Sequence, residues 1–214
     1  MSDIHIERMK ACGVIPVVSV PDAAAAVSLA NALLEGGIDV IELTLRTAAG
    51  LAAIEAVARS CPGMFVIAGT VVQPAQFAQV RDAGAKAVVS PGFSETLDDA
   101  ARAAGLPWLP GVATASEVMR AGERGRTALK FFPAELAGGI AMIKALAGPF
   151  PNIVFCPTGG VNTDNLGDYL ALKTVMCVGG TWLTPAASVA AGDWGAIRDE
   201  AARARRKVDE IRAA

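Results

Sequence analysis

Histidine is almost missing from this chain, which has 214 residues and a single histidine, His5. His5 falls in a segment that we expect to form an N-terminal helix, away from any candidate nucleophile, so a Ser-His-Asp triad is excluded unless His5 lies far from its local element. Imidazole is also the commonest ligand of transition metals, and no cluster of carboxylates replaces it here. We therefore expect no metal site and no cofactor.

Closely spaced cysteine pairs are missing too, because no Cys-x-x-Cys motif occurs among Cys12, Cys61, Cys156 and Cys177. Each lies in or beside an apolar, strand-like segment, where cysteine usually behaves as a small hydrophobic residue. The N-terminus has no charged region followed by an apolar run, and no apolar stretch reaches about 18 residues. We expect a cytoplasmic protein in a reducing compartment, without a membrane span.

An excess of positive charge is absent, since 19 Lys and Arg face 21 Asp and Glu, for a net charge of −2. The basic cluster at residues 203–207 is offset by nearby acids and is typical of a solvated helix face, so we expect no nucleic-acid partner. Aromatic residues make up only 5%, which leaves Ala, Val, Leu and Ile to build the core. The length suits one large core, and we expect one domain, residues 1–214.

Short β-branched runs alternate with alanine-rich helical segments along the whole chain. The expected strands are Ile15–Val18, Val40–Leu45, Phe65–Ala68, Ala87–Ser90, Pro107–Leu109, Ala128–Phe131, Ile153–Cys156 and Val175–Val178. The expected helices lie near 22–35, 49–60, 74–83, 94–104, 115–122, 138–147, 163–171 and 194–211. Eight strand–helix units predict an α/β fold, a closed (β/α)₈ TIM barrel preceded by one extra helix. A doubly wound open sheet is the alternative, although no GxGxxG follows the first strand.

Lys130 stands near the end of a strand-like run and is followed by Phe131, Phe132 and Pro133. An ammonium group against phenylalanine rings is poorly solvated, which favours the neutral amine. A neutral amine can attack a ketone and form a Schiff base. The alternative is a structural lysine whose head reaches water at the strand end.

Charged residues also interrupt the second expected strand, where alternation places Glu42, Thr44 and Arg46 on one face. We expect this face to point into the barrel, where buried charges are costly unless they are paired or used. A structural Glu–Arg pair is the alternative, but the two residues are about 13 Å apart along a strand, too far for contact.

Glycine and threonine follow the expected strands three, seven and eight. Gly69 could let the backbone approach a ligand, and Thr70 offers a hydroxyl and an amide to a carboxylate. The paired glycines lie at the ends of strands seven and eight, where barrels commonly bind phosphate with backbone amides. These paired glycines are Gly159-Gly160 and Gly179-Gly180. Tight turns use glycine for other reasons, so each pair by itself is weak evidence.

Several of these segments, taken in order along nearly the whole chain, resemble the 2-keto-3-deoxy-6-phosphogluconate (KDPG) aldolases. These are the class I, Schiff-base aldolases of the Entner–Doudoroff pathway, some of which also act on 4-hydroxy-2-oxoglutarate. The matching segments are Glu42-Leu43-Thr44-Leu45-Arg46-Thr47, Ala68-Gly69-Thr70-Val71, Ser90-Pro91-Gly92, Lys130-Phe131-Phe132-Pro133-Ala134-Glu135, Cys156-Pro157-Thr158-Gly159-Gly160 and Gly179-Gly180-Thr181-Trp182.

The resemblance implies a role for each candidate residue. Lys130 would be the Schiff-base lysine and Glu42 the general acid and base, while Arg46 and Thr70 would bind the pyruvate carboxylate. The rest would bind the sugar chain and the phosphate of a phosphorylated keto acid: Thr158, Gly159, Gly160, Gly179, Gly180 and Thr181. Thr181 replaces the serine that the family often has. The family is usually homotrimeric, which the residue pattern itself does not indicate.

Two other functions fit part of the pattern. A phosphosugar isomerase or epimerase shares the phosphate loops but does not require a lysine beside an interior glutamate and arginine. A non-catalytic sugar-phosphate-binding barrel would keep the glycine turns, since a fold alone does not define a function, but has no reason to combine Lys130, Glu42 and Arg46.

Overall fold

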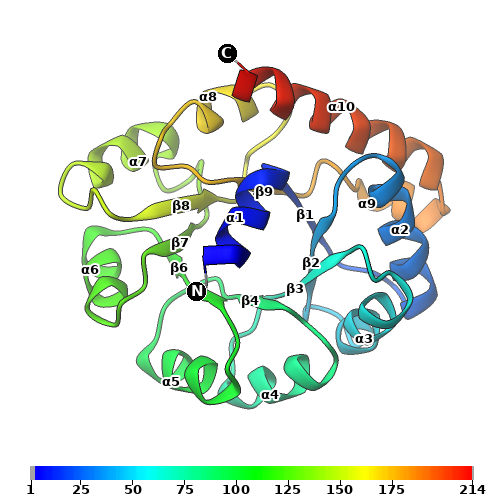
Figure 1. Cartoon of the computed structure of the whole chain (residues 1–214), viewed down its shortest axis with the longest axis horizontal. Coiled ribbons are helices and arrows are strands. Elements are labelled where there is room, and N and C mark those ends of the chain that lie inside the picture. Colours follow the sequence, from blue (N-terminus) through cyan, green and yellow to red (C-terminus); the bar gives the residue numbers. More distant parts are fainter. Residues whose placement is uncertain (1–2, 214) are drawn as a thin grey trace.

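The fold is a curled parallel sheet surrounded by helices, seen in a computed structural model that describes residues 3–213 (Figure 1). The strands are β1 (Val14–Val18), β2 (Val40–Thr44), β3 (Phe65–Gly69), β4 (Ala87–Val89), β5 (Trp108–Leu109), β6 (Gly111–Val112), β7 (Ala128–Phe131), β8 (Val154–Pro157) and β9 (Val178–Gly180). One sheet has the order β5-β4-β3-β2-β1-β9 and the other β6-β7-β8, and the pairings are parallel. Parallel strands with helices on the outside define an α/β fold.

The helices follow the strands nearly as the sequence predicts. They are α1 (Asp3–Cys12), α2 (Ala23–Glu35), α3 (Gly50–Ser60), α4 (Pro74–Asp82), α5 (Glu95–Ala104), α6 (Ala115–Glu123), α7 (Gly139–Ala147), α8 (Leu166–Leu170), α9 (Ala186–Ala191) and α10 (Trp194–Ala213). Thr114 and Glu117 form a capping box at the start of α6. Helix α9 was not predicted, and α8 is shorter than the expected 163–171.

The expected fifth strand, Pro107–Leu109, is found as β5, and a further short strand that was not predicted, β6, begins directly after Pro110. Strand β5 pairs with β4, and β6, on the other side of Pro110, pairs with β7. Proline has no N–H to donate to a neighbouring strand, but its carbonyl accepts from the Lys130 amide at 2.8 Å. Pro110 therefore lies at the junction of the two sheets.

The expected eighth strand, Val175–Val178, is wrong in its position. The observed strand is β9, whose register with β1 pairs Val14 with Val178 and Pro16 with Gly180. Val175 makes only an isolated bridge to Phe155, and Gly179 makes another to Thr158. Gly179 and Gly180 are therefore strand residues and do not form a turn after the strand.

Helix α1 packs at the amino-terminal end of the strands. The His5 ring lies 5.5 Å from the ring of Phe65, the first residue of β3. Burial lowers the pKa of His5. The histidine is thus placed at the end of the sheet opposite to the ends of the strands where Glu42 and Lys130 are found.

The four cysteines are buried and unpaired, as the sequence predicts. Burial raises the pKa of the Cys12 thiol to about 11. Burial and a hydrogen bond with Cys156 raise the pKa of Cys177. A raised pKa keeps a thiol protonated, and a protonated thiol is a poor nucleophile, which is consistent with a packing role for these cysteines.

One buried acid, Asp98 in α5, was not recognised in the sequence. Its side chain is fully buried and accepts hydrogen bonds from the guanidinium groups of Arg102, Arg124 and Arg126. Burial alone would raise the pKa of Asp98, but these three bonds outweigh it and hold that pKa below its ordinary value. The cluster ties α5 to the segment that leads into β7.

Candidate active site

Lys130 of β7 and Glu42 of β2 meet inside the ring of strands. The Lys130 ammonium Nζ lies 3.3 Å from Glu42 Oε1, and the two residues are only 5% and 3% exposed. The lysine head therefore does not extend into bulk water, which was the structural alternative. Each charge is paired with the other, as buried charges require.

Gly69, which we expected to bring the backbone close to a ligand, instead makes room for the glutamate. A Cβ added to Gly69 would lie 2.4 Å from Glu42 Oε1 and 2.6 Å from Glu42 Cγ. Gly69 of β3 pairs in register with Thr44 of β2, which lies two residues after Glu42. The absence of a side chain at Gly69 therefore determines where the Glu42 carboxylate can lie.

Arg46 does not lie on a strand, contrary to the sequence-based expectation. Strand β2 ends at Thr44, and Arg46 stands in the turn beyond it with an exposed side chain. The interpretation of a guanidinium buried in the barrel is therefore wrong. Thr44 does face inward and is 2% exposed, and its hydroxyl pairs with that of Ser19 at 2.7 Å.

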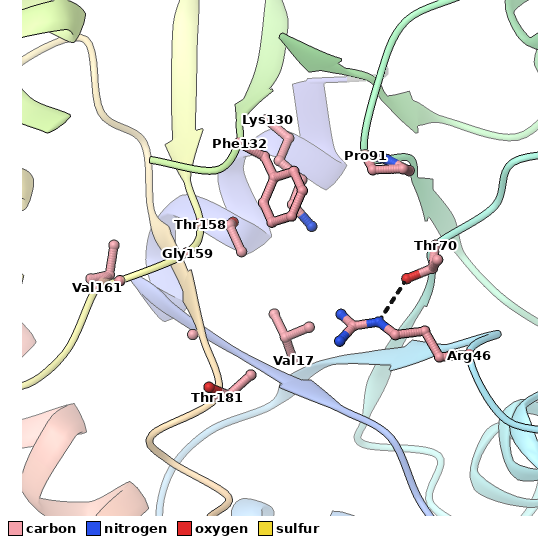
Figure 2. A pocket seen from close by; sticks show the side chains of 12 residues that line it. Val17, Arg46, Thr70, Pro91, Lys130, Phe132, Thr158, Gly159, Val161 and Thr181 are labelled. Carbon is pink, nitrogen blue, oxygen red and sulfur yellow. Dashed lines mark hydrogen bonds between the residues drawn. The ribbon is translucent and has the colours of Figure 1, made fainter. Parts of the chain in front are cut away.

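Thr70, directly after β3, receives a hydrogen bond from Arg46, whose Nε lies 3.2 Å from Thr70 Oγ1 (Figure 2). Among residues 3–213, Thr70 is the one non-glycine residue with a positive φ, 60°. Such a conformation costs a β-branched residue roughly 1–3 kcal/mol and persists only where its surroundings enforce it. The backbone at the end of β3 is thus held in a strained form that presents the Thr70 hydroxyl to Arg46.

Lys130, Arg46 and Thr70 border one cavity of about 210 Å³. Figure 2 shows the lysine amine and the guanidinium directed toward the same space from opposite walls. The Lys130 Nζ also lies 5.3 Å from the centroid of the Phe132 ring. The remaining lining residues are Val17, Pro91, Phe132, Thr158, Gly159, Gly160, Val161, Gly180 and Thr181.

The loop after β8 forms another part of the cavity wall. Gly159 and Gly160 have φ values of 100° and 83°, which favour glycine. The carbonyls of Thr158 and Gly159 accept the amides of Ala134 and Glu135, so the loop is tied to the segment that follows Lys130. A Cβ on Gly160 would lie 2.4 Å from Glu135 Cγ, so close packing also requires glycine there.

The two glycines of β9 differ in position. Gly180 and Thr181 line the cavity, whereas Gly179 is not among its lining residues. A Cβ on Gly179 would lie 2.5 Å from Thr158 Oγ1, so this glycine makes room for the Thr158 side chain. The structure therefore brings the candidate residues to one cavity, but two of them, Glu42 and Gly179, are not among its lining residues. Glu42 lies beside the lining residue Lys130, and Gly179 lies against Thr158.

Two lining residues were not singled out by the sequence-based interpretation, Val17 of β1 and Val161. Val17 lies inside the apolar strand β1 and Val161 follows the paired glycines of the β8 loop, and an isolated apolar side chain in either place carries no signal that separates it from the core. Among the side chains that the structure describes, those of residues 5–213, His, Cys, Asp and Glu form no group of three or more able to hold a metal ion. In the same range no helix has the length and hydropathy needed to cross a membrane.

Comparisons with known proteins agree with this arrangement. A family model described as KDPG and KHG aldolase matches residues 5–199. The chain is 48% identical over 191 residues to a 2-dehydro-3-deoxy-phosphogluconate aldolase of Pseudoalteromonas atlantica, covering 89% of each chain. It is 47% identical over 184 residues to the KHG/KDPG aldolase of Escherichia coli K12, covering 86% of each.

A solved structure is similar in three dimensions as well, with a TM-score of 0.90 at 41% sequence identity. It is a KDPG aldolase from Legionella pneumophila with pyruvate captured at low pH as a covalent carbinolamine intermediate, and the match covers 92% of this chain and 96% of that one. Similarity of this extent, over nearly the full length and around one cavity whose buried lysine is paired with a buried glutamate, places the chain in the KDPG and KHG aldolase family.

Proposed function

We propose that this protein is a class I aldolase, a lyase that cleaves 2-dehydro-3-deoxy-6-phosphogluconate to pyruvate and glyceraldehyde 3-phosphate. The observation that carries the proposal is the buried pair of Lys130 and Glu42, 3.3 Å apart, at a cavity bordered by the amine. The names of the relatives support the substrate. The name of the Escherichia coli relative extends the proposal to 4-hydroxy-2-oxoglutarate, which would yield pyruvate and glyoxylate.

Lys130 is the nucleophile in this proposal. In the unliganded pair Glu42 is the nearest proton acceptor, so it can take the proton whose loss makes the amine nucleophilic. The amine adds to the C2 ketone to give a carbinolamine, and loss of water gives an iminium. The captured carbinolamine in the Legionella pneumophila relative supports this route.

Glu42 then moves the protons of the carbon–carbon step. As Glu42 removes the C4 hydroxyl proton, directly or through one water, the C3–C4 bond breaks and its electrons pass into the iminium. Glyceraldehyde 3-phosphate leaves, and the remaining enamine is protonated at its methylene carbon. Hydrolysis of the new iminium frees pyruvate and restores the amine. One carboxylate can serve all these transfers because it lies within hydrogen-bond reach of Lys130.

Arg46 and Thr70 bind the pyruvate carboxylate. The guanidinium is exposed and directed into the cavity, and its fork of donors matches a carboxylate. Its present partner, the Thr70 hydroxyl, accepts only one N–H. The other guanidinium donors remain available for the substrate, and the hydroxyl proton of Thr70 is a further donor.

The part of the cavity wall formed by the loop after β8 and by the end of β9 binds the far end of the substrate. Thr158 lines the path of the sugar chain, and the phosphate binds at Gly159, Gly160, Gly180 and Thr181. The support is that these residues line the same cavity as Lys130, and that Gly159 and Gly160 have the positive φ values found in loops that bind anions with backbone amides. Gly179 belongs to this group by prediction, and its position indicates that it acts through Thr158.

The proposal has a direct test. Incubation with pyruvate and borohydride should add to the protein the mass of pyruvic acid less one oxygen atom, and the modified peptide should contain Lys130. Lys130→Met should abolish both the adduct and turnover. Lys144→Met is the matched control, because Lys144 is exposed on α7 away from the cavity. Turnover by Lys130→Met, or an adduct only on surface lysines, would overturn the assignment.

The finer architecture is part of the proposal. Closure into a (β/α)₈ barrel with α1 as an extra N-terminal helix is supported by the bridges Phe155↔Val175 and Thr158↔Gly179, which link the β8 side of one sheet to the β9 side of the other. One domain is supported by a hydrophobic cluster that runs from Met9 to Val208. Assembly as a homotrimer rests on the family resemblance and is tested by light scattering.

A cytoplasmic location is supported by the four unpaired, buried cysteines, since disulfides are rare in that compartment. Cell fractionation tests it. The proposed partners are small-molecule keto acids, phosphorylated in the case of the main substrate, with neither nucleic acid nor membrane among them.

A further inference from the structure

The strained conformation of Thr70 needs support from outside its own strand, and the next residue shows where the support comes from. The Val71 amide donates to the Val89 carbonyl at 3.2 Å. The Val71 carbonyl accepts a short hydrogen bond of 2.6 Å from the Ser90 hydroxyl. Both backbone groups of Val71 are therefore fixed by consecutive residues at the end of β4.

Ser90 is itself fixed in place. It is fully buried, and its amide donates to the Leu109 carbonyl at 3.2 Å. Its hydroxyl oxygen accepts a hydrogen bond of 2.8 Å from the indole Nε1 of Trp108, a residue of β5. Because the indole occupies an acceptor position of the oxygen, the hydroxyl proton is left to point at Val71.

Trp108 provides a rigid base for this chain of hydrogen bonds. It is 1% exposed, and its ring stacks on Phe93 with centroids 5.8 Å apart and meets the edge of Phe77 at 6.0 Å. The guanidinium of Arg126, which the buried Asp98 holds, lies 5.4 Å from the ring centroid. These contacts fix the orientation of the indole ring, and its N–H therefore points at the Ser90 hydroxyl.

We propose that Ser90 is a positioning residue for binding of the substrate carboxylate. Through Val71 its hydroxyl holds Thr70 at φ 60°, and the Thr70 hydroxyl in turn orients the guanidinium of Arg46. Figure 2 shows Pro91, the residue after Ser90, on the same side of the cavity as Thr70. Ser90 itself is not among the residues that line the cavity, so it acts only through its neighbours.

This inference rests on the proposed function, because it assumes that Arg46 and Thr70 bind a carboxylate. Its test compares pyruvate with methyl pyruvate, which keeps the ketone and lacks the negative charge. The measured quantity is the ligand concentration that gives half-maximal borohydride adduct. Loss of a well-placed hydrogen bond to a charged group corresponds to a change of about tenfold or more.

In Ser90→Ala we expect the half-saturating concentration of pyruvate to rise about tenfold, with that of methyl pyruvate within about twofold. The maximal amount of adduct should not change, because the Lys130–Glu42 pair is not touched. Thr184→Val is the matched control: Thr184 is also buried, at 5% exposure, but its hydroxyl has no hydrogen-bond partner. This control should shift neither ligand.

An equal rise for pyruvate and methyl pyruvate would mean that Ser90 only maintains the fold, and no rise for either would mean that it does not position the site. Either result overturns the inference. Failure of the wild-type protein to form any adduct would instead overturn the proposed function. If Ser90→Ala does not fold, Ser90→Cys keeps a weak donor and should give a smaller rise for pyruvate alone; no rise in a folded Ser90→Cys refutes the inference.

Discussion

A single methyl group at Gly69 should disable the proton-transfer step. The added Cβ would lie 2.4 Å from Glu42 Oε1, whereas ordinary contact begins at 3.4 Å. The backbone cannot separate to relieve this overlap, because β2 and β3 are paired continuously from Val40↔Phe65 to Thr44↔Gly69. The carboxylate must therefore shift by about 1 Å, which changes its geometry relative to the Lys130 amine, 3.3 Å away in the wild-type protein.

A displacement of about 1 Å between reacting groups can lower a rate about 10²-fold. We expect Gly69→Ala to reduce kcat by about this factor, while KM changes much less, since Arg46 and the glycine loops are not touched. The assay measures pyruvate release from 2-dehydro-3-deoxy-6-phosphogluconate, coupled to lactate dehydrogenase. Thermal unfolding is followed in parallel, because overpacking costs about 1–3 kcal/mol.

Gly122→Ala provides the matched control. Gly122 lies in α6, and a Cβ added there meets no atom within 4 Å. Alanine in a helix should be neutral or stabilising by roughly 0.5–1 kcal/mol, with kcat unchanged. Wild-type kcat in a folded Gly69→Ala would refute the reasoning that this glycine positions Glu42.

Glu42→Gln should lower kcat about 10²-fold or more with little change in KM, because it keeps the shape and removes the proton carrier; a pure KM effect would indicate a binding role. Arg46→Lys should raise the half-saturating pyruvate concentration in borohydride trapping about tenfold, since an ammonium lacks the forked donors. Asp98→Asn should destabilise the fold by about 3 kcal/mol or more at neutral pH, by leaving the buried Arg126 without its counter-charge. Since the pKa of Asp98 is lowered in the fold, its stabilisation is present above its unfolded pKa of about 3.9 and is lost as the pH falls below that. Urea titrations at pH 7 and below pH 4 should show the difference between Asp98→Asn and wild type shrinking, and a constant difference would contradict the assignment. Chelators should leave the wild-type rate unchanged, because the iminium serves as electron sink; a metal requirement would refute the Schiff-base route.

The sequence located Lys130 and Glu42 because a charge inside an apolar strand is a local anomaly. Each is flanked by residues that must be buried, so each must be buried as well, and the buried charges must be paired. The local pattern alone does not show that the two residues pair with each other, because that depends on how β2 and β7, from different sheets, lie across the ring. The expectation that Lys130 lies beside Glu42 came from the family resemblance, and the structure confirms it.

The predicted strand boundaries were wrong where the apolar composition or the alternation of a segment disagreed with the strand pairing in the fold. Val175–Val178 has the apolar composition of a strand, but pairing with β1 shifts the strand to Val178–Gly180. Arg46 continues the alternation of β2, yet the chain turns after Thr44. Alternation indicates which faces residues would occupy if the strand continued, and gives no information on where it stops.

The sequence did not identify residues whose role depends on which atoms lie next to them in the folded protein. Gly69 is informative only because the Glu42 carboxylate occupies the place of its missing side chain. Asp98 stands next to Asp99 in α5, and nothing local indicates that the first is buried and the second exposed. For such positions the tertiary contacts carry the information.

The site is built from two independent parts, and this division has kinetic consequences. Glu42, Thr70, Ser90 and Trp108 come from or directly follow β2, β3, β4 and β5, which are neighbours in one sheet. Hydrogen bonds between the ends of the neighbouring strands β3, β4 and β5 fix the residues that are proposed to bind the substrate carboxylate. The glycine loop after β8 belongs to the other sheet and is tied to the segment that follows β7. Changes at Arg46, Thr70 or Ser90 should therefore alter affinity for pyruvate itself, while changes at Gly159 or Gly160 should alter only substrates that carry the distal phosphate.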